Sequence, residues 1–318
     1  MAPLIWEKQE KVKRMAEFTW YHNGKWLPQS QVKPDPNDRG VTLGDQVVDV
    51  ERTFGGKGFR IKEHIDRLYK SLKHVRIEIG ISPAEMIEIT EEGISRNWPL
   101  LGEKSDLSIT QLVTRGQSRG RAWTAGPPNV YVKFGENNLG NWAHYYTEGV
   151  HGVITKVRSY EPDTIDPKVK HLSRMNMTLA ELEANDVDPG AWPILSDKGG
   201  NLTEGSGYNV FIVSGEGLRT PTDRAALAGI SRSMVMDLAM HLKMPCHEED
   251  LQPYDMYTAD EVFFTSTPFS ILPVTQVDRR NIGDGNPGPV TQQLLAAWSD
   301  VVGMDMIGQA IHQSRAST

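Results

Sequence analysis

The segment from Asp166 to Val210 restricts the fold of this 318-residue chain more than any other part of the sequence. It begins with DPKVKHLSRMNMTLAELEA, in which Lys170 stands just before an amphipathic helical pattern. A strand follows, and GGNLTEGSGYNVFIV then places Glu204 on a glycine-rich turn before a second strand. A lysine and an acid in this arrangement can hold a Schiff-base cofactor with a carboxylate beneath its ring. On residue chemistry alone this is a hypothesis, because most lysines are surface cations and most Glu-Gly pairs are ordinary turns.

Length, charge and cysteine content narrow the class of protein. A chain of 318 residues suits two domains better than one small domain. The net charge of −7 argues against nucleic-acid or anionic-membrane partners, because both require a clustered positive surface. The sequence has no run of 18 apolar residues and begins with a charged segment unlike a signal peptide, so we expect a cytoplasmic protein. With Cys246 as the single cysteine, an internal disulfide and a cysteine-based metal cluster are excluded.

Patterns in the first 135 residues predict a compact α+β unit. Asn23-Gly24, between two aromatic-rich runs, is typical of a tight hairpin turn. A β-branched run over residues 41–54 leads into a glycine turn, and apolar residues at 65, 68, 72 and 75 then fall on one face of a helix. Ser82-Pro83-Ala84-Glu85 has the N-cap, proline and capping acid of a second helix start. Alternating apolar residues over 107–113 and 130–134 indicate half-buried strands.

The polar, glycine-containing segment over residues 135–149 is typical of a linker between domains. We therefore expect an N-terminal arm over residues 1–17, a small α+β domain over 18–135, a linker over 136–149 and a large domain over 150–318. In the large domain, patterns predict strands at 152–157, 192–196, 209–213 and 260–265, and helices after Lys170, at 230–244 and at 290–301.

Several motifs together resemble one enzyme family. Lys170 is followed by LAELEA, TEGSGYNVF, LAGISR at 227–232, FFTSTPFSILPV at 263–274 and DGNPGPVTQ at 284–292. Their order and spacing resemble those of the class IV pyridoxal-phosphate aminotransferases over about residues 20–298. This family includes branched-chain amino acid, D-amino acid and (R)-selective amine transaminases. The resemblance implies fold type IV: a small N-terminal α+β domain, a larger domain with a β-barrel-like core, and pyridoxal 5'-phosphate between them.

The resemblance also implies roles for individual residues. Lys170 matches the lysine that forms the Schiff base and shuttles a proton in a ping-pong reaction. Glu204 matches the acid that keeps the pyridine nitrogen protonated, and Leu227 matches the apolar residue packed on one ring face. The matches predicted to hold the phosphate are Arg60, Ile230 and Ser231 at the start of a helix, and Ser266 and Thr267.

Three positions depart from the family pattern and bear on the substrate. Met175 stands where branched-chain transaminases have a tyrosine, and Val48 stands where several members have a carboxylate-binding tyrosine. Pro268-Phe269-Ser270 replaces the small residues usual in amine transaminases. Arg121, with Arg119 as the alternative, matches a loop arginine that binds a substrate carboxylate, which a planar guanidinium suits.

The motifs DPKVK, VTRG and EGSGYN look most like those of (R)-selective amine transaminases. We therefore expect a homodimeric or larger enzyme that moves an amino group between an (R)-amine or amino acid and a keto acid such as pyruvate. A branched-chain or D-amino acid aminotransferase is the alternative within the family. An enzyme like aminodeoxychorismate lyase is the alternative of another class, because it resembles the same family and uses the same lysine.

Two other patterns carry no functional prediction. The glycines at 283, 285 and 288 satisfy a dinucleotide-binding spacing, but prolines interrupt it and no βαβ unit surrounds it. His64, His171 and His247 lack the spacing of metal ligands, so we predict no metal site.

Overall fold

The computed structural model describes residues 17–215 and 217–316. The predicted N-terminal arm, residues 1–17, lies outside this part of the chain except for Glu17. The elements are, in chain order, β1 (Thr19–His22), β2 (Lys25–Pro28), η1 (Gln29–Gln31), α1 (Arg39–Leu43), β3 (Gln46–Phe54), β4 (Lys57–Gly58), α2 (Ile61–Val75), α3 (Pro83–Asn97), η2 (Trp98–Leu100), β5 (Leu107–Thr114), η3 (Ala122–Thr124), β6 (Asn129–Glu136), η4 (Leu139–Trp142), α4 (Tyr145–Glu148), β7 (Val150–Arg158), α5 (Met175–Val187), β8 (Trp192–Ser196), β9 (Leu202–Gly205), β10 (Asn209–Ser214), β11 (Gly217–Pro221), α6 (Ile230–His241), β12 (Cys246–Glu249), α7 (Pro253–Tyr257), β13 (Glu261–Ser266), β14 (Ser270–Val277), β15 (Arg280–Asn281), α8 (Pro289–Val302) and α9 (Met306–Ala316).

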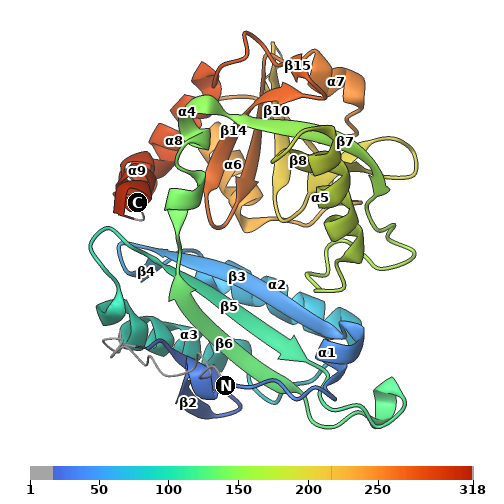
Figure 1. The fold of residues 1–318 in the computed structure, drawn as a ribbon, viewed down its shortest axis with the longest axis vertical. Helices are drawn as coiled ribbons and strands as arrows, with labels where there is room; N and C mark the ends of the chain where they lie inside the picture. The colour runs from blue at the N-terminus through green and yellow to red at the C-terminus, as the bar shows by residue number, and fades with distance from the viewer. Residues whose placement is uncertain (1–16, 216, 317–318) are drawn as a thin grey trace, which may run out of the picture.

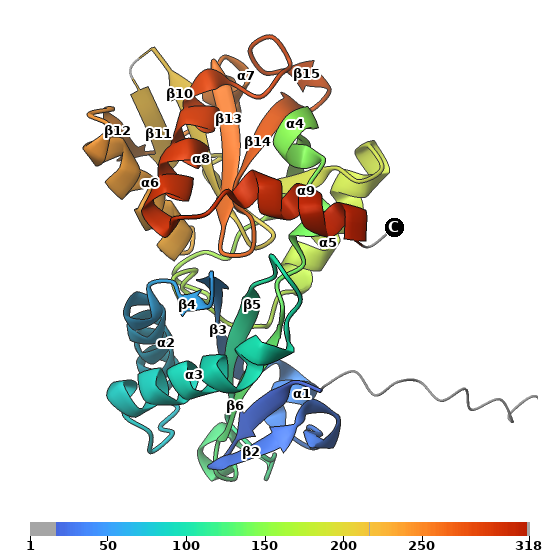
Figure 2. The ribbon, with the colours of Figure 1, turned by 90° about the vertical axis from the view of Figure 1, so that its left-hand side faces the viewer.

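The N-terminal half forms an antiparallel sheet of six strands in the order β2-β1-β6-β5-β3-β4. Helices α2 and α3 lie side by side on one face of this sheet, as Figure 2 shows. Their buried side chains, among them Ile65, Leu68 and Met86, pack against Ile109 and Phe134 of the sheet. The layer of helices over an antiparallel sheet gives this half one shared hydrophobic core.

Local signals in this half are confirmed. Asn23 and Gly24 have φ values of 46° and 85°, the positive values that the predicted hairpin turn requires. Ser82 caps α3, and the reciprocal hydrogen bonds between Ser82 and Glu85 form a capping box. The strand predicted from the β-branched run begins later than expected, however. Asp38 caps the short helix α1, so β3 starts at Gln46.

The C-terminal half contains a nine-stranded sheet of mixed direction, ordered β12-β11-β10-β13-β14-β7-β8-β9, with β15 on β14. An additional pairing of β9 with β10 joins the two sides of the sheet through Glu204 and Asn209. Buried side chains such as Phe211, Phe263 and Trp298 fill the core between the sheet and helices α6 and α8. This arrangement agrees with the expected barrel-like core of the larger half.

The segment predicted to be an aperiodic linker is largely helical. Residues 139–142 form η4 and residues 145–148 form α4, with Leu139 and Tyr146 buried. Tyr146 donates a hydrogen bond to the Phe269 carbonyl, so this segment packs against the C-terminal half. We infer that the two sheets mark the two domains.

The two halves lie one above the other (Figure 1). The loop between β7 and α5, which carries Lys170, reaches from the upper half to strand β3 of the lower half. There the Val48 N–H donates a hydrogen bond to the Lys170 carbonyl. Residues from both halves therefore meet at this loop. In residues 17–215 and 217–316, no helix has the length and apolar character needed to cross a membrane.

Candidate active site

One cavity lies where the loop after β7 meets the ends of β9, β13 and α6. We call it the Lys170 cavity. Its lining consists of Arg67, Lys170, Arg174, Glu204, Gly207, Tyr208, Asn209, Leu227, Gly229, Ile230, Ser231, Thr265, Ser266 and Thr267. The structure thus brings together seven residues that the sequence predicts for the cofactor site: Lys170, Glu204, Leu227, Ile230, Ser231, Ser266 and Thr267.

Lys170 is fixed by its backbone while its amine faces the cavity. The Lys170 N–H donates to Ser71 Oγ at 3.2 Å, and its carbonyl accepts from Val48 N–H at 2.8 Å. Burial lowers the pKa of the amine to about 7, and the positive charges of Arg67 and Arg174 add to this effect. A lysine with such a pKa is about half uncharged at pH 7, and its uncharged form can attack an aldehyde.

Glu204 is a buried carboxylate on β9, with 6% of its surface exposed. Its Oε2 accepts a hydrogen bond from Leu227 N–H at 3.0 Å. Burial raises the pKa of Glu204, whereas that hydrogen bond and the nearby cations oppose the rise. Its Oε1 has no hydrogen-bond partner among the described residues, so this oxygen can accept a hydrogen bond from a protonated nitrogen of a ligand.

The opposite end of the cavity suits an anion. Helix α6 begins at Ile230, and no side chain caps its N-terminus, so its first N–H groups and its dipole favour negative charge. The hydroxyl groups of Ser231, Ser266 and Thr267 line the same end. Gly229 precedes the helix, where a Cβ atom would collide with the Asn209 amide. The glycine therefore permits close approach of the backbone.

Arg67 supplies the cation at this end. Its Nε and Nη2 donate to the two oxygens of buried Asp49 at 2.9 and 2.7 Å, and its Nη1 donates to the Ala228 carbonyl at 3.1 Å. His64 Nδ1 lies 2.7 Å from the same carboxylate. Burial alone would raise the pKa of Asp49, but Arg67 and His64 lower it, so the carboxylate stays charged and fixes the guanidinium.

Arg60, which the sequence predicts as the phosphate ligand, does not line this cavity. Its backbone is left-handed at the start of α2, with φ 50°. Its Nη2 instead donates to Asp237 of α6 at 2.6 Å and contacts the Met234 sulfur. Arg60 is thus paired with an acid of α6, whereas Arg67 is the arginine of α2 that lines the cavity.

The side chains of the Lys170 cavity fit the predicted pyridoxal phosphate. The α6 N-terminus, the hydroxyl groups and Arg67 match a phosphate dianion. Glu204 has a free oxygen for the pyridine nitrogen, Leu227 offers an apolar surface for the ring, and Lys170 carries an amine suited to the aldehyde. The phosphate, the ring nitrogen and the aldehyde of the cofactor thus each have a partner of complementary chemistry in one cavity.

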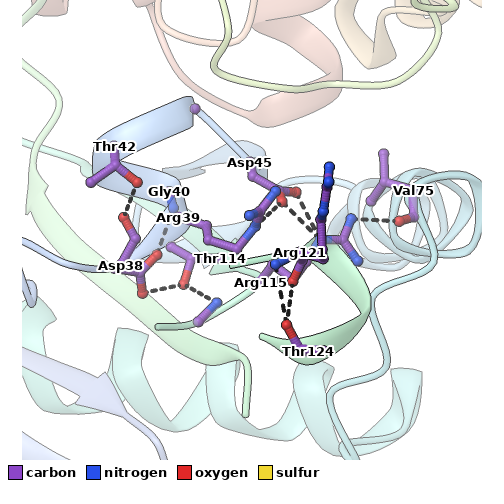
Figure 3. A network of polar contacts seen from close by, with 12 residues as sticks. Asp38, Arg39, Gly40, Thr42, Asp45, Val75, Thr114, Arg115, Arg121 and Thr124 are labelled. Atoms are coloured by element: carbon purple, nitrogen blue, oxygen red, sulfur yellow. Dashed lines mark hydrogen bonds and ion pairs between the residues drawn. The ribbon is translucent and has the colours of Figure 1, made fainter. Parts of the chain in front are cut away.

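Within one chain, none of the predicted substrate residues lines the Lys170 cavity. Val48 is buried beside Lys170 through its backbone contact, but its side chain lines neither this cavity nor the one that adjoins it. Arg119 and Arg121 are exposed on the loop between β5 and β6. In Figure 3 the Arg121 side chain extends from this loop, whose base is held by Arg115 bonded to Asp45 and to the Val75 carbonyl.

Sequence reasoning missed both arginines that line the cavity, Arg67 and Arg174. A signal for Arg67 was present, because His64, Arg67 and Ser71 form a polar stripe beside the apolar face of the helix. Arg174 follows Lys170 by four residues, and no local pattern distinguishes it from a surface cation.

Comparisons with protein families, sequences and solved structures all find aminotransferases. The family described as Amino-transferase class IV matches residues 46–277. A putative branched-chain-amino-acid aminotransferase of Methanocaldococcus jannaschii is 33% identical over 88% of this chain and 95% of its own. A D-alanine aminotransferase of Bacillus licheniformis is 29% identical over 88% and 95%. The structure of a branched-chain amino acid aminotransferase with pyridoxamine 5'-phosphate superposes with a TM-score of 0.81, at 26% identity over 91% of this chain and 96% of that chain. A branched-chain amino acid aminotransferase of Escherichia coli superposes with the same TM-score, at 25% identity over 90% and 95%.

Proposed function

Because this chain belongs to the class IV aminotransferases, enzymes that depend on pyridoxal phosphate, we propose that it moves an amino group between an amine or amino acid and a keto acid such as pyruvate. One observation carries this proposal. The Lys170 amine, with a pKa of about 7, shares a single cavity with the Glu204 carboxylate and an anion-binding helix terminus. Transfer of an amino group requires these three elements together.

When bound, pyridoxal phosphate supplies an aldehyde and an electron-withdrawing ring. Arg67 and the α6 N-terminus would hold the phosphate, and Leu227 would offer an apolar surface to the ring. Glu204 Oε1 would accept a hydrogen bond from the ring nitrogen and favour its protonated form. The Lys170 amine would hold the aldehyde in the resting enzyme and, once free, would serve as the base that takes up and returns the proton of the substrate carbon.

The first candidate donor is an (R)-amine, which the motifs DPKVK, VTRG and EGSGYN support. The second is a branched-chain or D-amino acid, which the names of the relatives support. A panel of both enantiomers of 1-phenylethylamine, D-alanine and L-leucine distinguishes them, each added to the holoenzyme without acceptor. We expect loss of the visible cofactor absorbance with (R)-1-phenylethylamine and not with its mirror image. Loss with D-alanine or L-leucine alone selects the second candidate.

We also infer that the protein acts as a homodimer. Helix α5 exposes Met175, Leu179 and Leu182, with 70%, 51% and 58% of their surfaces accessible. Their spacing of four and three residues places them on one face of the helix, an apolar surface next to the active site. A dimer would also allow the exposed Arg119 and Arg121 to reach the site of the partner, where either one is suited to bind a substrate carboxylate.

A further inference from the structure

A second cavity adjoins the Lys170 cavity. We call it the Tyr160 cavity, and its lining includes Tyr160, Asn176 and Met177. The two cavities share Lys170, Arg174, Glu204 and Leu227, whereas Arg67 and the hydroxyl groups of the anion-binding end line only the first. Lys170 and Arg174 therefore border both cavities.

Arg174 lacks the partner that comparable arginines have. Every other arginine in the described ranges that is buried or half-buried has a carboxylate oxygen within 4.0 Å: Arg39, Arg52, Arg60, Arg67, Arg115, Arg219 and Arg232. The half-buried guanidinium of Arg174 has neither an ion pair nor a hydrogen bond within residues 17–215 and 217–316. A partly desolvated cation without a counter-charge is costly, so a ligand that brings an anion to it gains free energy.

The charge of Arg174 acts at the reaction site. After burial and Arg67, it is the next cause of the low pKa of Lys170, and it also opposes the raised pKa of Glu204. Arg174 stands at the N-terminus of α5, which no side chain caps, and the first turn of this helix contributes Asn176 and Met177 to the Tyr160 cavity. The free N–H groups of that turn reinforce the positive potential.

We propose that Arg174 binds an anionic oxygen at the reaction site, either a carboxylate of the amino and keto acids or the ring oxygen of the cofactor. The proposal rests on the proposed function and names a determinant of its ligands. It also explains how this chain can lack the tyrosine that branched-chain transaminases have at the position of Met175, whose side chain is 70% exposed. In this chain the residue before it faces the cavity and presents a cation there.

Two binding measurements that need no turnover separate the two sources of the anion. The first is the dissociation constant of pyridoxal phosphate from the cofactor-free protein. The second is the dissociation constant of 4-methylvalerate, a carboxylate without an amine, from the holoenzyme by calorimetry. Both are measured for the parent, Arg174→Gln and Arg174→Lys. Arg158→Gln is the matched control, because Arg158 is exposed on neighbouring β7 and its side chain has no partner among the described residues.

For Arg174→Gln we expect at least a ten-fold weaker binding in one measurement, with an intermediate loss for Arg174→Lys, which keeps the charge but not the planar fork. A loss confined to 4-methylvalerate assigns the anion to the substrate, and a loss for pyridoxal phosphate assigns it to the cofactor. Both constants within two-fold of those of Arg158→Gln would overturn the proposal.

A third measurement uses only the parent protein and so does not depend on folding of a variant. Phenylglyoxal modifies accessible arginines, and mass spectrometry locates the modified residue. Binding of pyridoxal phosphate or 4-methylvalerate should protect Arg174 and leave Arg158 reactive. Equal reaction of both arginines with and without ligand contradicts the proposal. If the parent holoenzyme transfers no amino group from any donor, the proposed function fails, while these binding results still decide the role of Arg174.

Discussion

Lys170 and Glu204 line one cavity but are fixed by different parts of the chain. The backbone of Lys170 is bonded to Ser71 and Val48 of the N-terminal half, and Glu204 is bonded to Leu227 N–H of the C-terminal half. The relative position of amine and acid therefore depends on how the two halves pack. This is the property that an active site at a domain junction requires.

The low pKa of Lys170 gives a direct prediction. Burial and the two arginines destabilise the protonated amine, so Lys170 of the cofactor-free protein should lose its proton near pH 7 rather than near its usual pH of about 10.4. The reaction rate of Lys170 with an amine-labelling reagent, followed by peptide mass spectrometry, should rise as the pH passes through 7. Exposed Lys198 in the same sample is the reference. A shared midpoint for the two lysines would remove the electrostatic basis of the mechanism.

The assignment of the phosphate cation to Arg67 gives a second prediction. Arg67→Gln should weaken binding of pyridoxal phosphate to the cofactor-free protein by ten-fold or more, because a charge-assisted hydrogen bond contributes about 1.5–3 kcal/mol. Arg67→Lys, which keeps the charge beside Asp49, should recover part of the affinity. Arg60→Gln should change affinity by less than about three-fold, since its contact is a partly exposed ion pair. A larger loss for Arg60→Gln than for Arg67→Gln would show that Arg60 binds the phosphate, as the family resemblance implies.

These two arginines show how far the sequence predicts the site. The types of group were predictable, because the chemistry demands an amine, an acid, an apolar surface and an anion-binding helix start. Arg60 and Arg67 stand seven residues apart in one segment, and choosing between them requires knowing that Asp237 pairs with Arg60 and Asp49 with Arg67. Asp237 is distant in sequence from Arg60, and Asp49 lies on a different element from Arg67. The local sequence pattern therefore does not decide which of the two arginines lines the cavity.

At the scale of elements, strand β3 connects the two halves through Arg52. Its Nη1 donates to the Pro268 carbonyl at 2.8 Å, and its Nη2 lies 3.3 Å from Gln309 Oε1 on α9 and 3.6 Å from Asp106 Oδ2. The guanidinium carbon stands 3.9 Å from the centre of the Phe54 ring. Pro268 follows Thr267 of the anion-binding end, so Arg52 also holds that loop in place.

Arg52→Met should therefore lower the free energy of unfolding of the cofactor-free protein by about 3–5 kcal/mol, because it leaves Asp106 buried without its cation. Denaturation by urea, followed by circular dichroism, measures this change. Arg96→Met is the control, since Arg96 forms an exposed pair with Glu92 on one helix and should cost less than about 1 kcal/mol. Equal losses for the two variants would show that Arg52 does not stabilise the junction.

Elements with strong local signals were predicted, and those set by distant contacts were not. The helix face over 65–75 and the cap at Ser82 are encoded within a few residues. The segment of η4 and α4 has the polar, aperiodic pattern of a linker, yet Leu139 and Tyr146 are buried by contacts with α9 and β14. Parallel pairing of β7 with β14 and β8 likewise depends on residues far apart in the chain.

At the scale of the whole molecule, the apolar face of α5 gives a prediction about assembly. Leu179→Asp combined with Leu182→Asp should convert the expected dimer into a monomer, because buried charges at a contact are strongly unfavourable. Light scattering after size-exclusion chromatography reports the mass. Met240→Asp, on α6 with 75% of the side chain exposed, is the control and should leave the mass unchanged. A parent protein that is already monomeric would contradict the inferred dimer.

The measurement that tests the central claim most directly is a single half-reaction on the holoenzyme. An amine donor from the panel is added in excess without acceptor, and the visible absorbance of the bound cofactor is followed by stopped flow. We predict that the band disappears with the parent and returns on addition of pyruvate, whereas in Lys170→Ala the visible absorbance persists over the same period. A band that no donor removes, or one that Lys170→Ala loses at a rate within ten-fold of the parent, would contradict the assignment of this site as an aminotransferase centre built on Lys170.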